Sequence, residues 1–563
     1  MRTPLPVPSR RSRRVRRGAT LALAVTLLAA SCSGGSDKKG SSANGSYSGA
    51  ESDQISEQGD PVTGGSIVVA LEAETNSLLP GTGSFAESGW NVGLAIFDPL
   101  MVRDAEGELK PYLAESMTPS DDLSEWTLKL REGVTFHDGT ALDAEAIKTI
   151  FDDFLTAETA NTAASLAEVE EVTVDDPLTV TYHLAGPNSA FPGLLTSAAG
   201  WPFSPTAAKA AGEDAGAKPV GTGPFKLDSW QRDHELVVSR NDDYWQDGLP
   251  YLDKITFRPI PDEDTRRDSL QAGTVQAAIT LRQSAVAQYR EMDGVDNYEA
   301  LSNASGGNII NTTRPPFDDL RVRKALVHAI DQDELIDVLG GAGITPPSSQ
   351  LFSPEDPFYS EKVKAAYPGF DADAATALLD EYVNDPERSD GKAPGTKITV
   401  HYDCPPDPSL NELSQLYQAQ WQGVGFEVEL RQVEQSTHVS EALAKNYDVK
   451  CFRFGSSLDP WQVLDDAFTE GPLNFTGLQS PTIEEQLEIM KGTTDVAKRK
   501  AAAEVIGVEV NENAPLTYSG STLTDIAVKD SVKNVAGMTF PNGDPGPGLT
   551  NAITFWGFAW LAE

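Results

Sequence analysis

Cysteine and histidine are scarce in this sequence, which has three cysteines and six histidines among 563 residues. The histidines stand singly, and no H-E-x-x-H, G-x-S-x-G or G-x-x-x-x-G-K-S/T motif occurs. The sequence therefore lacks the common signatures of a zinc protease, a serine hydrolase and a P-loop nucleotide-binding site. We expect no enzymatic activity, catalytic residue, metal site or cofactor, and a secreted hydrolase is the alternative from another class of function.

Basic residues are also few: the chain has 44 lysines and arginines but 84 acidic residues, which gives a formal charge of −40. Seven of the arginines lie in residues 1–31, and without them the charge becomes about −47. The phosphate field of nucleic acid or of an anionic membrane surface would repel so acidic a chain. Nucleic acid is therefore excluded as a partner, while solubility outside the cell and a preference for cationic or neutral ligands both remain open.

Long hydrophobic runs are absent apart from residues 19–30, a nearly apolar segment behind an arginine-rich region. Such a segment is too short to remain as a membrane span and is typical of an export signal. It ends just before Cys32, and this arrangement resembles a bacterial lipoprotein signal, in which the cysteine becomes the lipidated first residue. Ala29 replaces the usual leucine. An ordinary secretory signal is the alternative, and Sec and Tat export both remain open.

Residues 1–31 are therefore predicted to be the signal peptide, and residues 32–61 a flexible tether. The tether is rich in glycine and serine, and such a segment cannot bury enough apolar surface to fold. We expect an exported monomer, held on the outer face of the bacterial cytoplasmic membrane by its N-terminal lipid only.

From Gly64 onward the sequence changes to strand and helix patterns. Residues 66–71 are typical of a buried strand, and residues 126–136 begin with the alternation of a second strand. The stretch HDGT (137–140) follows, and Asp143 then stands at the N-cap position of a helix with one apolar face. HDGT is thus predicted to be a structural corner and not a catalytic or metal-binding pair.

Further strands are predicted at residues 236–239 and 255–260, and a helix at residues 322–339. Between residues 397 and 454 the order strand, helix, strand, helix, strand predicts a parallel sheet with right-handed crossovers. The first and third of these strands are expected to be neighbours, which would bring Cys404 near Cys451. A disulfide suits an exported protein, and two free thiols are the alternative.

Six stretches of the chain carry a family resemblance, among them GGSIVVALEAETNSLLP, WTLKLREGVTFHDGTALDAEAI, PVGTGPFKLDSW and NTTRPPFDDLRVRKALVHAIDQDELI. In this order they resemble the family 5 extracellular solute-binding proteins of ABC importers, which include peptide- and nickel-binding lipoproteins. The resemblance extends almost from end to end of the mature chain.

The resemblance implies an α/β, two-lobed periplasmic-binding-protein (Venus flytrap) fold with a large, subdivided lobe I and two crossing hinge strands. Laid on this sequence, lobe I takes residues 62–307 and the return segment 520–563, and lobe II takes residues 308–519. A subdomain of lobe I is expected at about residues 98–217. The hinges are expected at residues 303–313 and 514–523.

The resemblance also implies four loops at the ligand. In the loop after the first strand, Phe85, Glu87 and Trp90 are candidate ligand-binding residues. Thr222, within a G-T-G stretch, and Asn474 are candidates in two further loops. No histidine lies in the four loops, which gives no support to a metal chelate as ligand.

The fourth loop departs from the pattern of peptide-binding relatives, in which an aspartate pairs with the peptide's α-ammonium. Counting back from Pro460, Arg453 and Ser456 stand where those relatives have tryptophan and that aspartate, and Phe454 lies beside them. The usual partner of a buried ammonium is thus missing. Arg453 can pair with a carboxylate or phosphate of the solute or with surface acids, and a shifted alignment would instead place Asp459 in the site.

The predicted function is that of an extracellular receptor that captures a peptide-like or other small polar solute between two lobes. It would deliver this solute to an ABC import permease, whose subunits are its expected protein partners. A surface receptor for signalling peptides that transports nothing would have the same fold. The sequence does not name the ligand.

Overall fold

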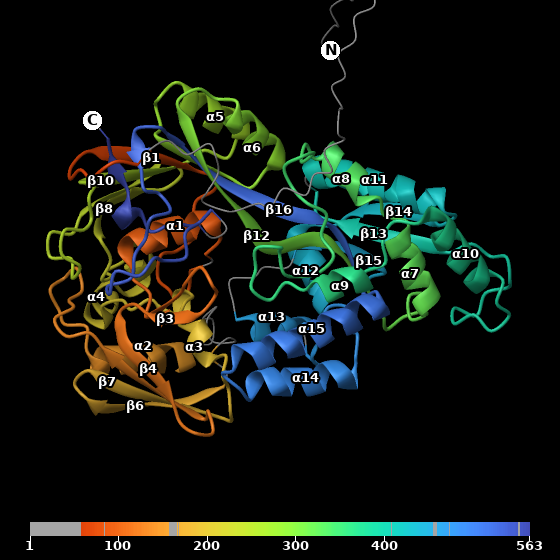
Figure 1. Ribbon diagram of the computed structural model, residues 1–563, viewed down its shortest axis with the longest axis horizontal. Coiled ribbons are helices and arrows are strands. Elements are labelled where there is room, and N and C mark those ends of the chain that lie inside the picture. The colour runs from red at the N-terminus through yellow and green to blue at the C-terminus, as the bar shows by residue number, and fades with distance from the viewer. Residues whose placement is uncertain are drawn as a thin grey trace, which may run out of the picture. The chain divides into compact units, whose positions relative to one another are not determined.

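Two long antiparallel strands, β12 (Val295–Ile310) and β16 (Leu516–Lys529), run through the middle of the main sheet. They pair from Val295 opposite Lys529 to Ile309 opposite Leu516, and Figure 1 shows them side by side. This computed structural model describes residues 58–83, 85–156, 166, 168–406, 408–453, 459–471, 473–549 and 552–562, without the side chains of residues 302–305, 408, 409, 436 and 453. All of these belong to one compact unit, Ser46–Glu563.

The main sheet has ten strands in the order β14–β13–β15–β12–β16–β11–β1–β10–β9–β8. Besides the two long strands it contains β1 (Ser66–Leu71), β8 (Phe225–Gln231), β9 (Glu235–Arg240), β10 (Lys254–Pro259), β11 (Ala277–Thr280), β13 (Thr399–Cys404), β14 (Glu427–Gln432) and β15 (Val449–Arg453). β1 pairs in parallel with β10 and β11, and β13 pairs in parallel with β14 and β15. The predicted strand at residues 66–71 and the parallel arrangement between residues 397 and 454 are confirmed.

The helices surround the sheets in several groups (Figure 1). They are α1 (Glu87–Ile96), α2 (Ala144–Thr156), α3 (Phe191–Leu194), α4 (Pro205–Ala211), α5 (Glu263–Gln271), α6 (Gln283–Arg290), α7 (Leu320–His328), α8 (Gln332–Val338), α9 (Glu361–Ala366), α10 (Ala372–Val383), α11 (Pro408–Gly423), α12 (Gln435–Leu443), α13 (Pro460–Phe468), α14 (Pro481–Lys491) and α15 (Val496–Asn513). Among the residues that the structure describes, none of the helices has the length and apolar character needed to cross a membrane.

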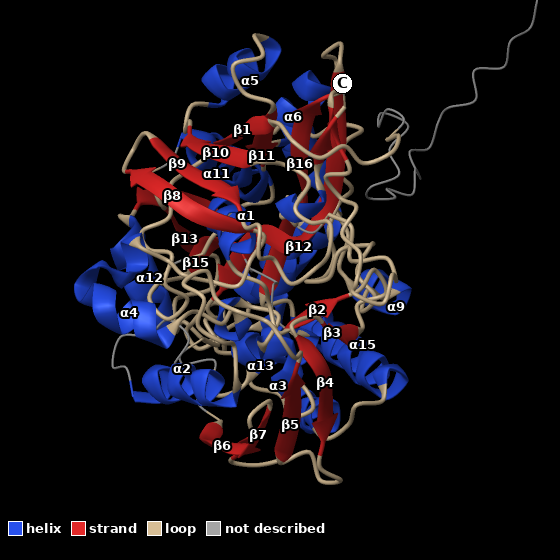
Figure 2. Ribbon diagram, turned by 90° about the vertical axis from the view of Figure 1, so that its left-hand side faces the viewer, coloured by secondary structure: helices blue, strands red, loops and turns tan. Residues whose placement is uncertain are grey.

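A separate antiparallel sheet lies within residues 114–184, in the order β4 (Ala114–Pro119), β5 (Glu125–Leu130), β7 (Thr179–Leu184) and β6 (Val169–Asp176). Figure 2 shows it near α2. The prediction that the second strand continues to Phe136 is wrong. β5 ends at Leu130 because the chain then turns through Gly133, whose φ of 85° lies in the left-handed region. Two further ribbons pair β2 (Met101–Arg103) with β3 (Leu109–Pro111), and β17 (Val532–Lys533) with β18 (Trp560–Leu561).

The HDGT stretch is a structural corner, as predicted. The Asp138 carboxylate accepts hydrogen bonds from the backbone N–H of Thr140 at 3.0 Å and from the Ser204 hydroxyl at 2.6 Å. The His137 ring bonds through Nε2 to the carbonyl of Gly223 at 3.0 Å, and burial lowers the pKa of His137 to about 4. Asp143 caps α2 by accepting from Ala146 N at 2.9 Å. His137 and Asp138 thus join this corner to the segments at Gly223 and Ser204.

The predicted single helix at residues 322–339 is wrong, because the structure has two helices there, α7 and α8. Asp331 lies between them in an extended conformation, and its carboxylate accepts hydrogen bonds from the backbone N–H groups of Asp333 and Glu334 at 3.1 and 3.2 Å. Aspartate is a favoured N-cap residue. The apolar periodicity continues across the break, which is why it did not reveal the second helix start.

The apolar cores follow the division of the main sheet. The largest cluster runs from Ile67 to Ala300 and resumes from Ile526 to Ala559, so the end of the chain packs with its first half. A second cluster lies between Ile310 and Cys451. The lobe boundaries drawn from the sequence remain predictions. If they are right, each of these two clusters should lie mainly within one lobe.

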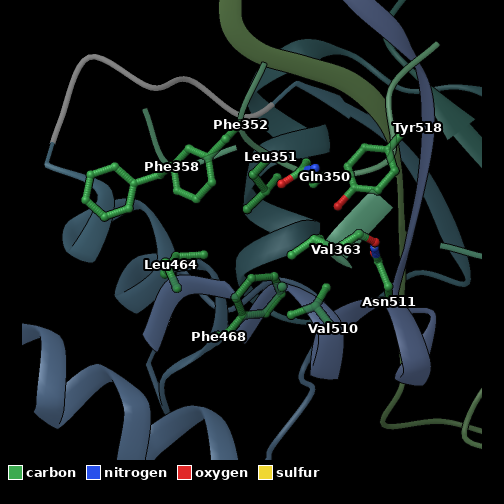
Figure 3. Close-up of a pocket in the computed structure, with 12 residues that line it drawn as sticks. Gln350, Leu351, Phe352, Phe358, Val363, Leu464, Phe468, Val510, Asn511 and Tyr518 are labelled. Atoms are coloured by element: carbon green, nitrogen blue, oxygen red, sulfur yellow. The ribbon is translucent and has the colours of Figure 1, made fainter. Parts of the chain in front are cut away.

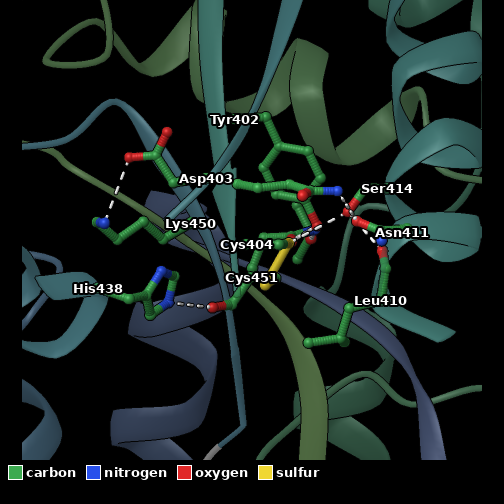
Figure 4. Close-up of a disulfide and its surroundings, with 12 residues drawn as sticks. Tyr402, Asp403, Cys404, Leu410, Asn411, Ser414, His438, Lys450 and Cys451 are labelled. Atoms are coloured by element: carbon green, nitrogen blue, oxygen red, sulfur yellow. Dashed lines mark hydrogen bonds and ion pairs between the residues drawn. A yellow bond between two sulfur atoms is a disulfide. The ribbon is translucent and has the colours of Figure 1, made fainter. Parts of the chain in front are cut away.

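Cys404 and Cys451, for which the sequence left a disulfide and free thiols open, are bonded in the structure, with their Cα atoms 5.3 Å apart. They lie on the neighbouring strands β13 and β15, and Ser414 Oγ lies 3.2 Å from Cys404 Sγ (Figure 4). Beside them, the fully buried Lys450 and Asp403 form an ion pair at 3.3 Å. The cysteines belong to the apolar cluster on one face of the sheet, whereas Lys450 and Asp403, their neighbours in sequence, point to the other face.

We expect reduction of this disulfide to lower the free energy of unfolding by about 2–4 kcal/mol, because the bond restricts the unfolded chain. The two cysteines are 47 residues apart in sequence. Thermal unfolding measured with and without a phosphine reductant tests this. The unfolding temperature of a Cys404→Ala/Cys451→Ala variant should not respond to the reductant. Mass spectrometry verifies that the wild type has been reduced, by a gain of two hydrogens. An unchanged unfolding temperature of the reduced wild type would contradict the expectation.

Candidate functional site

The end of the loop after β1 and the first turn of α1 place two aromatic side chains over a buried tryptophan. The half-buried rings of Phe85 and Trp90 pack edge-on against Trp201, with ring centroids 5.0 and 4.7 Å away. Trp201 is fully buried and stacks on Phe97 at 5.9 Å, while its indole N–H has no hydrogen-bond partner among the described residues. The structure thus brings two of the predicted site residues together on a ring that the sequence analysis missed, and no motif around Trp201 would have indicated it.

Glu87 is the first residue of α1, which it enters as an acidic residue in the first turn, where negative charge suits the helix dipole. It is half-buried, and its charge acts on Glu72, the residue directly after β1. The pKa of Glu72 is raised mainly by burial, against the lowering effect of Arg266, with Glu263 and Glu87 adding smaller repulsions. Glu87 therefore adds negative charge near Glu72, which the positive charge of Arg266 offsets.

Thr222 is buried and forms part of a cluster around Asp98. The Asp98 carboxylate accepts hydrogen bonds from Trp245 Nε1 at 2.9 Å, Tyr244 OH at 3.0 Å and Thr222 Oγ1 at 3.4 Å. Burial raises the pKa of Asp98 to about 7, although these hydrogen bonds oppose the shift. The hydroxyl of Thr222 is thus already engaged by the protein.

Asn474 is also buried and organises its own turn. Its side-chain amide donates to the Leu478 carbonyl at 2.8 Å, and its oxygen accepts from Gly477 N at 2.9 Å and Thr476 Oγ1 at 3.1 Å. Both ends of the side chain therefore hold the loop, and the structure does not bring Asn474 to the aromatic side chains of Phe85 and Trp90.

The fourth predicted loop lies mostly outside the described residues. Phe454 and Ser456 are not described, and of Arg453 only the backbone, at the end of β15, is described. The loop ends at Asp459, which is fully buried. One carboxylate oxygen accepts from Trp461 N at 2.9 Å and from Arg499, and the other pairs with Arg103 at 3.1 Å.

These hydrogen bonds and ion pairs determine whether Asp459 can bind a solute ammonium. Both of its oxygens are occupied by arginines or by the backbone at the start of α13. A solute ammonium would have to displace an arginine from a buried carboxylate, which is strongly unfavourable. Asp459 is thus not available as the amine anchor that a shifted alignment would have supplied.

Residues 108–475 match the family model of the bacterial extracellular solute-binding proteins, family 5, middle region. The chain belongs to this family. The glutathione-binding protein GsiB of Escherichia coli (strain K12) is 35% identical over 284 residues, which make up 49% of this chain and 55% of that protein. The chain thus spans about half the length of the curated relatives it matches.

Solved structures show the same fold. The substrate-binding protein CtaP from Listeria monocytogenes aligns with a TM-score of 0.74 at 21% identity, covering 89% of this chain and all of that one. NikA from Brucella suis, in complex with Fe(III)-EDTA, aligns at 0.74 with 23% identity over 86% of this chain and all of its own. The oligopeptide-binding protein AppA from Bacillus subtilis, in complex with a nonapeptide, aligns at 0.71 with 21% identity over 90% of this chain and all of its own. The predicted fold class and family are confirmed.

A small pocket of this protein lies between the segment around residue 350 and helices α13 and α15 (Figure 3). Its volume is about 20 Å³, and its walls are mainly apolar, with Phe352, Leu464 and Phe468 among them. The two polar residues in the wall, Gln350 and Asn511, are hydrogen-bonded to backbone groups. The space is that of one water molecule, so this pocket is a packing gap and not a solute site. No group of three or more potential metal ligands occurs within the described part of the chain.

We expect Asp98 to make stability depend on pH. Its pKa of about 7 lies above the ordinary value of 3.8, so between these values the folded state keeps a proton that the unfolded state loses. The unfolding free energy of the wild type, relative to Asp98→Asn, should therefore fall by a few kcal/mol from about pH 5 to about pH 8. Urea unfolding of both proteins across this range tests it, and a difference that stays constant or grows with pH would contradict it.

Proposed function

We propose that this protein is a solute-binding receptor that captures a small polar or peptide-like solute between two lobes and passes it to an ABC import permease. The observation that carries the proposal is the family match over residues 108–475, on a sheet whose two halves share the long strands β12 and β16. Ligand that contacts both halves would stabilise a closed state, which is how such a receptor signals that it is occupied. The function proposed is capture and release of the solute without a chemical reaction.

The proposed solute lacks the free N-terminal ammonium of a conventional peptide. Ser456 occupies the position of the usual acidic anchor, and Asp459 is held by Arg103 and Arg499. Glutathione is a suitable first candidate, because GsiB is named for binding it. Its γ-glutamyl linkage leaves the α-ammonium beside a free α-carboxylate, so its amine end is a zwitterion and not the lone ammonium of a conventional peptide. We propose Arg453 as the partner of a solute carboxylate.

Within the site, the proposed roles differ between the predicted residues. Phe85 and Trp90 would offer an apolar surface, supported from beneath by Trp201, and Glu87 would favour a neutral or cationic group of the solute. Thr222 and Asn474 would shape their loops through the hydrogen bonds they already make. Phe454 and Ser456 complete the proposed site by their sequence positions.

The solute is best identified by native mass spectrometry of the protein purified from its own organism, followed by calorimetry with glutathione and with trialanine. We expect one defined retained mass and binding of glutathione but not of trialanine, because the anchor for a peptide ammonium is absent. A mixture of short-peptide masses, or tight binding of trialanine, would contradict the proposed solute class while leaving the receptor function in place.

We also propose that Cys32, which lies outside the described residues, is lipidated and anchors the protein to the outer face of the cytoplasmic membrane as a monomer. A Cys32→Ser variant should move from the membrane fraction to the soluble fraction, because the lipid would be the only membrane contact. Immunoblots of fractionated cells test this. If the variant remains with the membrane in the same proportion as the wild type, the anchor is not at Cys32.

A further inference from the structure

A second set of contacts joins the segment 98–217 to the helices α13–α15, away from the crossing strands. At its centre, Arg103 at the end of β2 reaches Asp459, 356 residues later, with Nη2 at 3.1 Å from Oδ2. Figures 1 and 2 both show α3, from the same segment, beside α13. We call these contacts the Arg103–Asp459 seam.

The surroundings of Arg103 and Asp459 hold the two side chains close together. Arg103 is held in place by a further hydrogen bond from Nη1 to the Gly107 carbonyl at 3.0 Å. Gly193 in α3 lies directly against it, since a Cβ on this glycine would be 2.9 Å from Arg103 Nη2 and 3.0 Å from Asp459 Cβ. A side chain at this position would force the arginine or the aspartate to shift, so three separate parts of the chain fit closely together at this point.

Two more contacts lie along the same seam. The backbone N–H and the hydroxyl of Ser189 donate to the carbonyls of Lys491 and Met490, both at 2.8 Å, at the C-terminal end of α14. The Lys491 ammonium in turn pairs with Glu168 at 2.5 Å. These contacts satisfy carbonyls that an α-helix leaves free at its C-terminus, and they connect the same two parts of the chain as the Arg103 pair.

We propose that the Arg103–Asp459 seam is a closure latch, in which Arg103 sets the affinity for solute without touching it. This inference rests on the proposed receptor function, in which residues 98–217 belong to lobe I and residues 308–519 to lobe II. The seam forms when the lobes close and separates when they open. A contact made in only one of two states shifts the equilibrium towards that state, so the seam favours closure and slows solute release.

The arrangement around Asp459 explains how the latch can open. Arg499 comes from α15, on the same side of the seam as Asp459, and pairs with its other carboxylate oxygen. When Arg103 withdraws, Asp459 keeps Arg499 and its hydrogen bond from Trp461 N. The carboxylate is then not left as an unpaired buried charge, which would make opening prohibitively costly. Arg103 is a quarter exposed and can take water as its partner.

The test measures the distance between two spin labels, on Lys209→Cys in α4 and Glu485→Cys in α14, by electron–electron resonance. Both positions are exposed and lie on opposite sides of the seam. The full chain would carry Cys32→Ser, so that labels attach only at the two new cysteines. Without solute, Arg103→Met should shift the distances towards longer values, and Arg103→Lys, which keeps the charge but not the planar fork, should give an intermediate result.

Arg258→Met is the matched control, because Arg258 pairs with Glu235 at 3.2 Å within one half of the sheet. It should leave the distances unchanged. As a second variant, Gly193→Ala keeps both charges but places a methyl group against the pair, and should lengthen the distances as Arg103→Met does. Unchanged distances in Arg103→Met and Gly193→Ala, with both folded by circular dichroism, would overturn the latch.

Glutathione is the probe for the functional consequence. We expect its dissociation from Arg103→Met to be about tenfold faster than from the wild type, which corresponds to about 1.4 kcal/mol. If glutathione binds equally well to all variants while the distances change, the latch does not set affinity and that part of the inference fails. If the wild type does not bind glutathione, the proposed solute is wrong, and the distance measurement still decides whether the latch exists.

Discussion

The pairing of β12 with β16 is the interaction on which the rest of the structure depends. Each of these strands belongs to both halves of the main sheet, since β11 joins β16 on one side and β15 joins β12 on the other. The two halves therefore cannot separate without breaking this ladder, but they can move if it bends. Its register shifts between Ser302 and Ser305 and between Gly306 and Gly307, and such irregularities increase local bending and twist.

Hydrogen bonds within the protein limit which of the candidate ligand-binding residues have polar atoms left to contact a solute. Thr222 and Asn474 direct their polar atoms to Asp98 and to a turn, so these atoms hold loops in shape. Phe85 and Trp90 are different, because their rings pack on Trp201 but are only partly buried. In the proposed function, a solute would meet these aromatic rings next to Glu87, the first residue of α1.

Asp459 shows how a single residue can serve two purposes. As the N-cap of α13 it begins a helix, and as the shared partner of two arginines it joins residues distant in the sequence. A sequence pattern that places an aspartate near a ligand cannot distinguish these uses, because the distinction lies in which cations reach its two oxygens. Because both oxygens of Asp459 are occupied, the proposal that the solute-binding site lacks an acidic anchor does not depend on the alignment at Ser456 alone.

Local patterns in the sequence were enough to predict the strand at residues 66–71, the capped helix after HDGT, the parallel unit between residues 397 and 454, and the family. These depend on side-chain periodicity, capping and short motifs, which act over a few residues. The helix start at Asp331 was missed because the apolar periodicity continued across it. The end of β5 was missed because a glycine turn outweighed the apolar residues that follow.

The sequence by itself determined the family, since six stretches in the family's order carry the resemblance, and the fold class followed from that resemblance. Only the tertiary structure decided that Trp201 supports Phe85 and Trp90, that Cys404 bonds Cys451, and that Arg103 and Arg499 hold Asp459. The reason is physical: these contacts join residues tens to hundreds of positions apart. Their geometry is set by the packing of whole elements and by burial, and no local pattern records either.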